Sequence, residues 1–160
     1  NGDRSDRRPC LALAPARAMG QALDMQTLHL VLALGGAVLP AGGAVLAPCP
    51  SSPNCVSTDA TDPGHAIAPI PLDVAPDVAA GRLRQALATL PRVRIVSDDG
   101  RHIRADSTSC LFRFVDDVDL VVDEAAGVIH MRSASRTGYS DLGANRKRLE
   151  AIRRAYGAGA

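Results

Sequence analysis

The stretch CLFRFVDDVDLVV, residues 110–122, decides the fold because it holds the longest alternation of apolar and charged residues in the chain. Successive side chains of a β-strand point to opposite faces, so this alternation predicts a strand with one buried and one solvated face. The even-numbered positions form the apolar face, with Asp116 as its one charged member. A buried carboxylate needs a partner, so the fold must supply one for Asp116.

A second alternating stretch, residues 128–136, follows after a short loop and predicts a neighbouring antiparallel strand. Matching the two apolar faces sets Asp116 opposite Ser135, so that the buried carboxylate meets a hydroxyl. The same register places Asp119 opposite Arg132 on the other face, where opposite charges stabilise a cross-strand pair.

A hairpin precedes these strands, with Asp98-Asp99-Gly100 as its loop and Gly100 in the left-handed conformation. The apolar pattern predicts that Val93 pairs with Ala105 and Ile95 with Ile103, because a slip of one residue would set apolar side chains against charged ones. The opposite face of the hairpin carries its charged residues: Arg92, Arg94, His102, Arg104 and Asp106.

Two helices are predicted from apolar residues at helical spacing, over residues 76–90 and 141–156. Pro76 stands where its missing N–H costs nothing, and Pro91 and Gly157 follow the two helices as stop signals. The economical packing is an α+β fold, with a four-stranded antiparallel sheet and two helices packed on one face.

The chain divides into a leader at residues 1–47, an extended Pro-rich lead-in at 48–75 and an α+β domain at 76–157. The charge-free run at residues 28–39, followed by small residues, is typical of an export signal. A membrane anchor through residues 28–47 is the competing interpretation, which the glycines and the proline of this span disfavour. A buried segment is the third interpretation of this apolar run. Export would place the domain outside the cytoplasm.

Cys49 and Cys55 bracket a short Pro-rich segment, which predicts a small disulfide loop in an oxidising compartment. Free thiols and a metal site are the alternatives, although a structural zinc site needs four ligands and only one cysteine pair is present here. We expect Cys110 to be a small core residue.

Composition narrows the class of protein. The formal net charge is +1, which argues against general nucleic-acid binding. The chain has no Trp and only two Phe and two Tyr, so the core must consist of aliphatic residues. No nucleotide-binding, phosphate-binding or zinc-protease motif occurs. We therefore expect no cofactor and no metal, and an enzyme is not the favoured class.

Three stretches carry a family resemblance: CPSSPNCVS at residues 49–57, FRFVDDVDLVVD at 112–123, and RSASRTGYSDLGANRKRLEAIR at 132–153. With these, the chain resembles the family called domain of unknown function 1499, which occurs in bacterial envelopes and in photosynthetic eukaryotes. The resemblance implies a periplasmic or thylakoid-lumen location and no known activity.

The stretch at residues 132–150 is the candidate site, and three interpretations remain open. As a cradle it would bind a small anion or an envelope protein partner, because forked guanidinium groups and helix N-termini both favour anions. The candidate ligand-binding residues are Arg132, Ser133, Ser135, Arg136, Tyr139 and Arg146.

As a structural clasp the same stretch would join the last strand to the last helix through paired carboxylates, a helix cap and glycine turns. The clasp residues are Asp116, Asp117, Asp119, Gly138, Asp141, Gly143 and Asn145. As an unrecognised hydrolase or metal-dependent enzyme, it would use Asp117, Asp119, His130 and Arg132 on the outer face of the sheet. Consecutive strand residues such as Asp116 and Asp117 point to opposite faces and cannot easily share one metal ion. The sequence therefore favours an exported accessory or ligand-binding protein.

Overall fold

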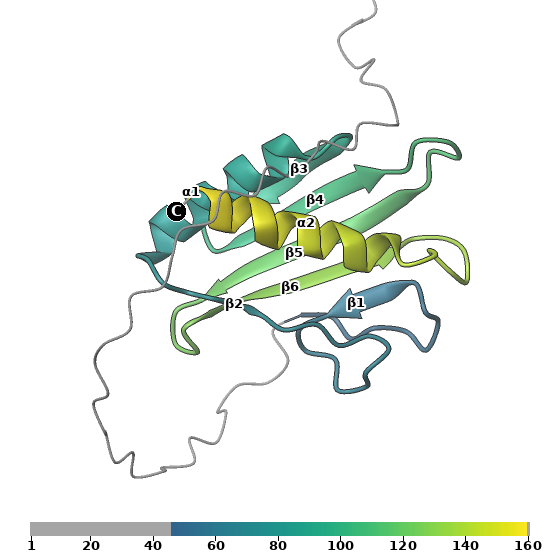
Figure 1. Ribbon diagram of the computed structural model, residues 1–160, viewed down its shortest axis with the longest axis horizontal. Helices are drawn as coiled ribbons and strands as arrows, with labels where there is room; N and C mark the ends of the chain where they lie inside the picture. Colours follow the sequence, from purple (N-terminus) through teal and green to yellow (C-terminus); the bar gives the residue numbers. More distant parts are fainter. Residues whose placement is uncertain (1–45, 160) are drawn as a thin grey trace, which may run out of the picture. The chain divides into compact units, whose positions relative to one another are not determined.

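The computed structural model describes residues 46–159, which form an antiparallel sheet with two helices (Figure 1). The predicted α+β class is confirmed. In chain order the elements are β1 (Cys55–Ser57), β2 (Ile70–Pro71), α1 (Pro76–Thr89), β3 (Val93–Asp98), β4 (His102–Thr108), β5 (Val115–Asp123), β6 (Val128–Ser135) and α2 (Ala144–Ala158). The predicted leader lies outside the described residues, apart from its last two.

The sheet has six strands, so the prediction of four is wrong. Its order is β1-β6-β5-β4-β3, and β2 also pairs with β6. The two additional strands come from the Pro-rich lead-in, for which the sequence predicts an extended segment without strand pairing. Without them β6 would be an open edge with unpaired backbone groups, and short strands are enough to cover such an edge. Pro71 fits there because an edge position does not require its N–H.

The central register is as predicted. Asp116 pairs with Ser135 and Asp119 with Arg132 across β5 and β6. The even positions of β5 are buried throughout and its odd positions are partly exposed. A shift by one residue would move every apolar side chain of β5 to the outer face, which explains why the alternation specifies this pairing.

The strand predicted to begin at Cys110 begins only at Val115. Residues 110–114 form an exposed loop instead, so the prediction that Cys110 lies in the core is also wrong. The loop is closed by Ser109, whose amide donates to the carbonyl of Phe114 at 2.8 Å and whose Oγ accepts from the Phe114 amide at 2.9 Å. The alternation of residues 110–114 lies beyond the end of the neighbouring strand β4, so these residues have no strand to pair with.

The register predicted for the hairpin is wrong by two residues. Val93 pairs with Ser107 and Ile95 with Ala105, and the register shifts at a bulge between Ile95 and Ser97. A shift of two keeps each side chain on its predicted face. The bulge adds one residue to the edge strand, and the loop keeps Gly100 in the left-handed conformation at φ 89°.

Both helices cover the same face of the sheet, and the core lies between these two layers (Figure 1). The core is aliphatic, as the composition predicts: Leu83 and Leu87 of α1 and Leu149 and Ile152 of α2 pack against the even positions of β5. Within residues 46–159, neither helix is long and apolar enough to cross a membrane.

The lead-in is held by arginines of α2 as well as by the pairing of its two strands with β6. Arg146 donates to the carbonyls of Ala66 and Gly64 at 2.9 and 3.0 Å, and Arg153 donates to the carbonyl of Ala68. The predicted disulfide between Cys49 and Cys55 is present. These contacts order a segment that has little core of its own.

Replacing both Cys49 and Cys55 with serine should lower the free energy of unfolding by about 2 kcal/mol, because the disulfide closes a short loop and restricts the unfolded chain. Denaturant unfolding of the oxidised protein and the double variant measures this difference. Equal stability of the two would contradict it.

The turn at residues 62–65 predicts a pH dependence. A hydrogen bond with Asp62, at 2.7 Å, raises the pKa of His65 above its ordinary value of 6.5 and lowers that of Asp62. A raised pKa in the folded state means that the contribution to stability is complete below the unfolded value and is lost as pH rises through the folded value. The loss of stability in His65→Ala should therefore be larger at about pH 6 than at about pH 9.

Denaturant unfolding of His65→Ala and of the natural chain at the two pH values tests this prediction. Asp62→Asn serves as the control, because it removes the carboxylate whose hydrogen bond raises the pKa of His65 and should reduce the pH dependence. A pH-independent cost of His65→Ala would contradict the assignment.

Candidate functional site

Polar side chains gather on both faces of the β5–β6 pair, and the two groups differ in character. The inner clasp lies between sheet and α2 and consists of Asp116, Ser133, Ser135, Asn145 and Arg148. The outer hollow lies on the opposite face and is lined by His102, Arg104, Asp117, Asp119 and Arg132, together with Leu46 and Ala47.

The centre of the inner clasp is a buried ion pair. Nη2 of Arg148 lies 2.6 Å from Oδ2 of Asp116, and the two side chains are only 11% and 7% exposed. Nη1 of Arg148 also donates to Oγ of Ser133 at 2.8 Å and to Oδ1 of Asn145 at 2.6 Å. Such a buried charge is tolerable only when it is paired and hydrogen-bonded, and both conditions hold here.

Asn145 extends the clasp to the lead-in. Its Nδ2 donates to the carbonyl of Asn54 at 2.8 Å and to Oγ of Ser135 at 3.1 Å, while its Oδ1 accepts from Ser133 at 2.6 Å. The residue is completely buried, and all of its polar atoms have partners. One side chain therefore joins α2, β6 and the segment before β1.

Arg148 is the clasp residue that sequence reasoning missed. The sequence predicts that Asp116 meets the hydroxyl of Ser135, whereas its partner is the guanidinium group of Arg148 from α2. The signal was available: Arg148 follows Asn145 by three residues and precedes the buried Leu149, so both polar residues lie near the inward face of α2.

The helix N-terminus is occupied by the chain itself. Asp141 accepts hydrogen bonds from the amides of Gly143 and Asn145 at 2.9 and 2.7 Å. Gly138 and Gly143 have φ of 88° and 79°, a conformation that favours glycine, in the loop that leads into the helix. An external anion at these amides would have to displace the carboxylate of Asp141.

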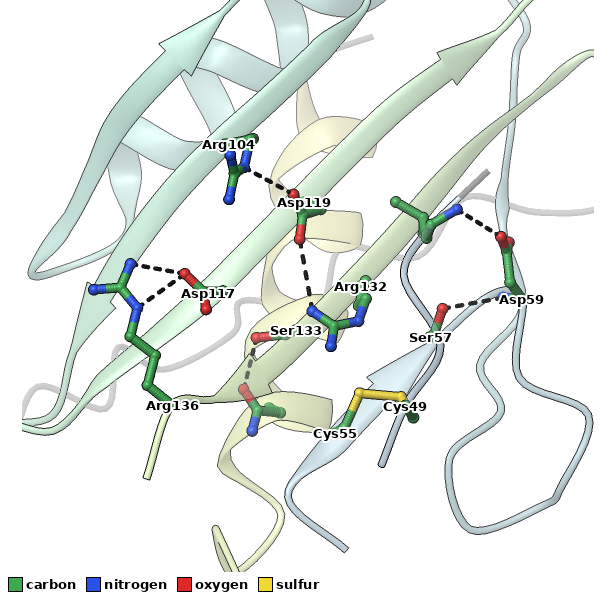
Figure 2. A network of polar contacts seen from close by, with 12 residues as sticks. Cys49, Cys55, Ser57, Asp59, Arg104, Asp117, Asp119, Arg132, Ser133 and Arg136 are labelled. Carbon is green, nitrogen blue, oxygen red and sulfur yellow. Dashed lines mark hydrogen bonds and ion pairs between the residues drawn. A yellow bond between two sulfur atoms is a disulfide. The ribbon is translucent and has the colours of Figure 1, made fainter. Parts of the chain in front are cut away.

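The outer hollow is built by three neighbouring strands. Figure 2 shows Arg104 of β4, Asp119 of β5 and Arg132 of β6 in a row, with the carboxylate between the two guanidinium groups. Arg104 Nε lies 3.3 Å from Asp119 Oδ1, and Arg132 Nη1 lies 3.7 Å from Asp119 Oδ2. His102 Nε2 is also 3.0 Å from Oδ1 of Asp119. The hollow has a volume of about 260 Å³.

Arg132 is the least satisfied member of the hollow. Its side chain is only 13% exposed, yet its Nε has no hydrogen-bond partner among the described residues. Within residues 46–159 its single ionic contact, to Asp119, is longer than a hydrogen bond. A guanidinium has five N–H donors, so most of the donor capacity of Arg132 remains available.

The six candidate ligand-binding residues do not converge on one point. Ser133 and Ser135 belong to the inner clasp, and Arg146 binds lead-in carbonyls. Arg136 donates to Asp117 at 2.7 Å and to Asp106 at 2.5 Å, and the hydrogen bond to Asp117 raises the pKa of Arg136. Tyr139 is exposed. Only Arg132 lines the hollow, where His102 and Arg104 accompany it. The sequence predicts that both residues lie on the charged face of the hairpin, but it does not assign them to a site.

The four residues of the enzyme hypothesis are likewise divided. Asp119 and Arg132 adjoin in the hollow and Asp117 is paired with Arg136, but His130 Nδ1 is bonded to Asp59 at 2.9 Å. The hydroxyl beside His130 is that of Thr58, whose Oγ1 lies 3.3 Å from His130 Nδ1, and Thr58 is not one of the four residues. Residues 46–159 contain no group of three or more His, Cys, Asp or Glu side chains arranged to hold a metal ion.

Arg148→Met should lower the free energy of unfolding by about 3 kcal/mol or more, because it leaves the Asp116 carboxylate buried without its ion-pair partner. Arg84→Met is the matched control: its pair with Asp98 is substantially exposed, so the loss should stay below about 1 kcal/mol. Denaturant unfolding measures both. Similar losses of stability in the two variants would show that the buried ion pair stabilises the fold no more than the exposed one.

The comparisons with known proteins agree with the resemblance seen in the sequence. A search of the curated proteins finds no match to this chain. The model of the family described as Protein of unknown function (DUF1499) matches residues 45–156, a span that contains both the inner clasp and the outer hollow. The chain therefore belongs to the DUF1499 family.

Proposed function

We propose that this protein is an extracytoplasmic ligand-binding domain whose outer hollow holds a small anion. Arg132 is the central binding residue in this proposal, with His102 and Arg104 beside it. The observation that carries the proposal is the buried guanidinium of Arg132, whose Nε has no partner among the described residues. A buried charged donor without a partner is costly, and an anionic ligand would remove that cost.

The charge balance of the hollow supports an anion. Two arginines face the hollow, and Asp119 is the carboxylate that adjoins both of them. The other lining carboxylate, Asp117, is paired with Arg136. One positive charge therefore remains in excess. A forked guanidinium in a partly desolvated site binds a carboxylate or phosphate more strongly than it would in open water.

The size of the hollow limits the ligand. Its volume of about 260 Å³ is below the range of about 300–1,000 Å³ that is usual for drug-sized ligands. The proposal therefore concerns phosphate, a short carboxylic acid, or the anionic end of a longer molecule that extends out of the hollow.

The compartment is inferred from the disulfide. The bond between Cys49 and Cys55 is compatible with an oxidising location. Together with the apolar run at residues 28–39, it supports an exported accessory protein of the cell envelope or thylakoid lumen. The competing enzyme hypothesis has weaker support, because His130 is bonded to Asp59 outside the hollow and Asp117, which lines the hollow, is paired with Arg136.

Calorimetric titration with inorganic phosphate and with succinate tests the proposal. Arg132→Gln should weaken binding by about tenfold or more, because it removes charge-assisted hydrogen bonds. It should change the free energy of unfolding by less than about 1 kcal/mol, since Asp119 keeps its contacts with His102 and Arg104.

Arg94→Gln is the matched control, because Arg94 is an arginine of the neighbouring strand β3 that does not line the hollow. It should bind both anions as the natural protein does. The proposal fails if neither anion binds the natural protein, or if Arg132→Gln and Arg94→Gln bind equally well.

A further inference from the structure

The aromatic residues of the chain are distributed unevenly. Of its two Phe and two Tyr, only Tyr156 belongs to the core. Phe112 and Phe114 lie in the β4–β5 loop and Tyr139 lies in the β6–α2 loop. In a protein so poor in aromatic residues, the placement of three of four on exposed loops requires an explanation other than core packing.

The two loops are neighbours at one end of the sheet. Figure 1 shows both at the end where β4 and β6 terminate, and the amide of Arg136 donates to the carbonyl of Val115 where the loops begin. The loops carry five large apolar side chains that are between 52% and 89% exposed, and we call this group the apolar tip: Leu111, Phe112, Phe114, Tyr139 and Leu142.

The tip is a formed structure. The rings of Phe112 and Phe114 stack with their centroids 5.6 Å apart. Between them Arg113 has a φ of 54°, and in the other loop Leu142 has a φ of 53°. Left-handed backbone is uncommon for residues other than glycine and costs free energy, so it persists where the surrounding contacts impose it. Such sites are concentrated where loops have a function.

An exposed positive charge lies at the tip. Arg113 is exposed and makes no ion pair within the described residues. The carboxylates on this side already have partners: Asp106 and Asp117 bind Arg136, and Asp141 binds the first amides of the last helix. An anionic surface could therefore approach the tip without meeting an unpaired carboxylate.

We propose that the apolar tip docks this domain onto a lipid bilayer that contains anionic lipids. Aromatic and aliphatic side chains would enter the headgroup region while Arg113 contacts lipid phosphates. Tyrosine and basic residues that flank apolar side chains are the usual composition of membrane interfaces. A bilayer also suits two loops that project beyond the sheet, whereas a stable protein partner would need about 800 Å² on this side.

The absence of tryptophan from the chain allows a direct test. Phe112→Trp places the only tryptophan at the tip. Val78→Trp is the matched control, because Val78 is similarly exposed but lies in the first turn of α1, the end of the helix remote from the tip. Both full-length variants are titrated with vesicles of phosphatidylcholine mixed with phosphatidylglycerol, and tryptophan emission is recorded.

We expect the emission of Phe112→Trp to shift to shorter wavelength with these vesicles and that of Val78→Trp to stay unchanged. Adding Arg113→Gln to Phe112→Trp should raise the lipid concentration at half-maximal shift about fivefold, the effect of one basic residue at an anionic surface. This readout reports on the tip even if another part of the chain also binds lipid.

Three results would overturn the proposal. The first is no shift of Phe112→Trp with vesicles, and the second is an equal shift of both tryptophan variants. The third is a shift of Phe112→Trp that depends on protein concentration in the absence of lipid, which would assign the tip to contact with a second copy of the chain.

Discussion

The ion pair between Asp116 and Arg148 is the contact on which the arrangement of this fold depends. Asp116 stands on the buried face of β5, where an unpaired carboxylate would be strongly unfavourable. Its partner must come from α2, and this requirement sets where the helix crosses the sheet. Asn145 and Ser133 then complete the hydrogen bonds that two buried charges need. Apolar packing alone would accept several positions of a helix on a sheet, whereas this network accepts one.

The same two strands serve different purposes on their two faces. On the inner face every polar atom of Asn145 has a partner, as expected of a structural network. On the outer face Arg132 has fewer partners than donors. Adjacent residues of β6, Arg132 and Ser133, thus belong to environments of opposite character, separated only by the pleat of the strand. The polar residues that lie close together in the sequence of β6 therefore belong alternately to the outer hollow and to the inner clasp.

Sequence reasoning succeeded where a long alternating pattern had to meet another. The pairing of β5 with β6 agrees with the prediction from Asp116, because this register brings the misfit residue opposite the hydroxyl of Ser135 while all apolar positions remain inside. Sequence reasoning failed where the local pattern of apolar residues does not determine how a strand pairs. The bulge after Ile95 lies in an edge strand that is largely exposed, so burial does not select its register. β1 and β2 are only three and two residues long, and their pairing with β6 is distant in sequence. On the outer face, the pairing of Asp119 with Arg132 was predicted correctly, but the Nε of Arg132 without a partner among the described residues can be seen only in three dimensions.

The attachment of the lead-in has a consequence for the order of assembly. β1 and β2 pair with β6, the carbonyls at residues 64, 66 and 68 bind arginines of α2, and that of Asn54 binds Asn145. Every one of these partners lies more than fifty residues further along the chain. Contacts so distant in sequence close late and slowly, so residues 46–75 are synthesised before their partners and dock last. Local opening should begin in the same place, which would make residues 46–75 the earliest target of a protease while the rest of the domain stays folded.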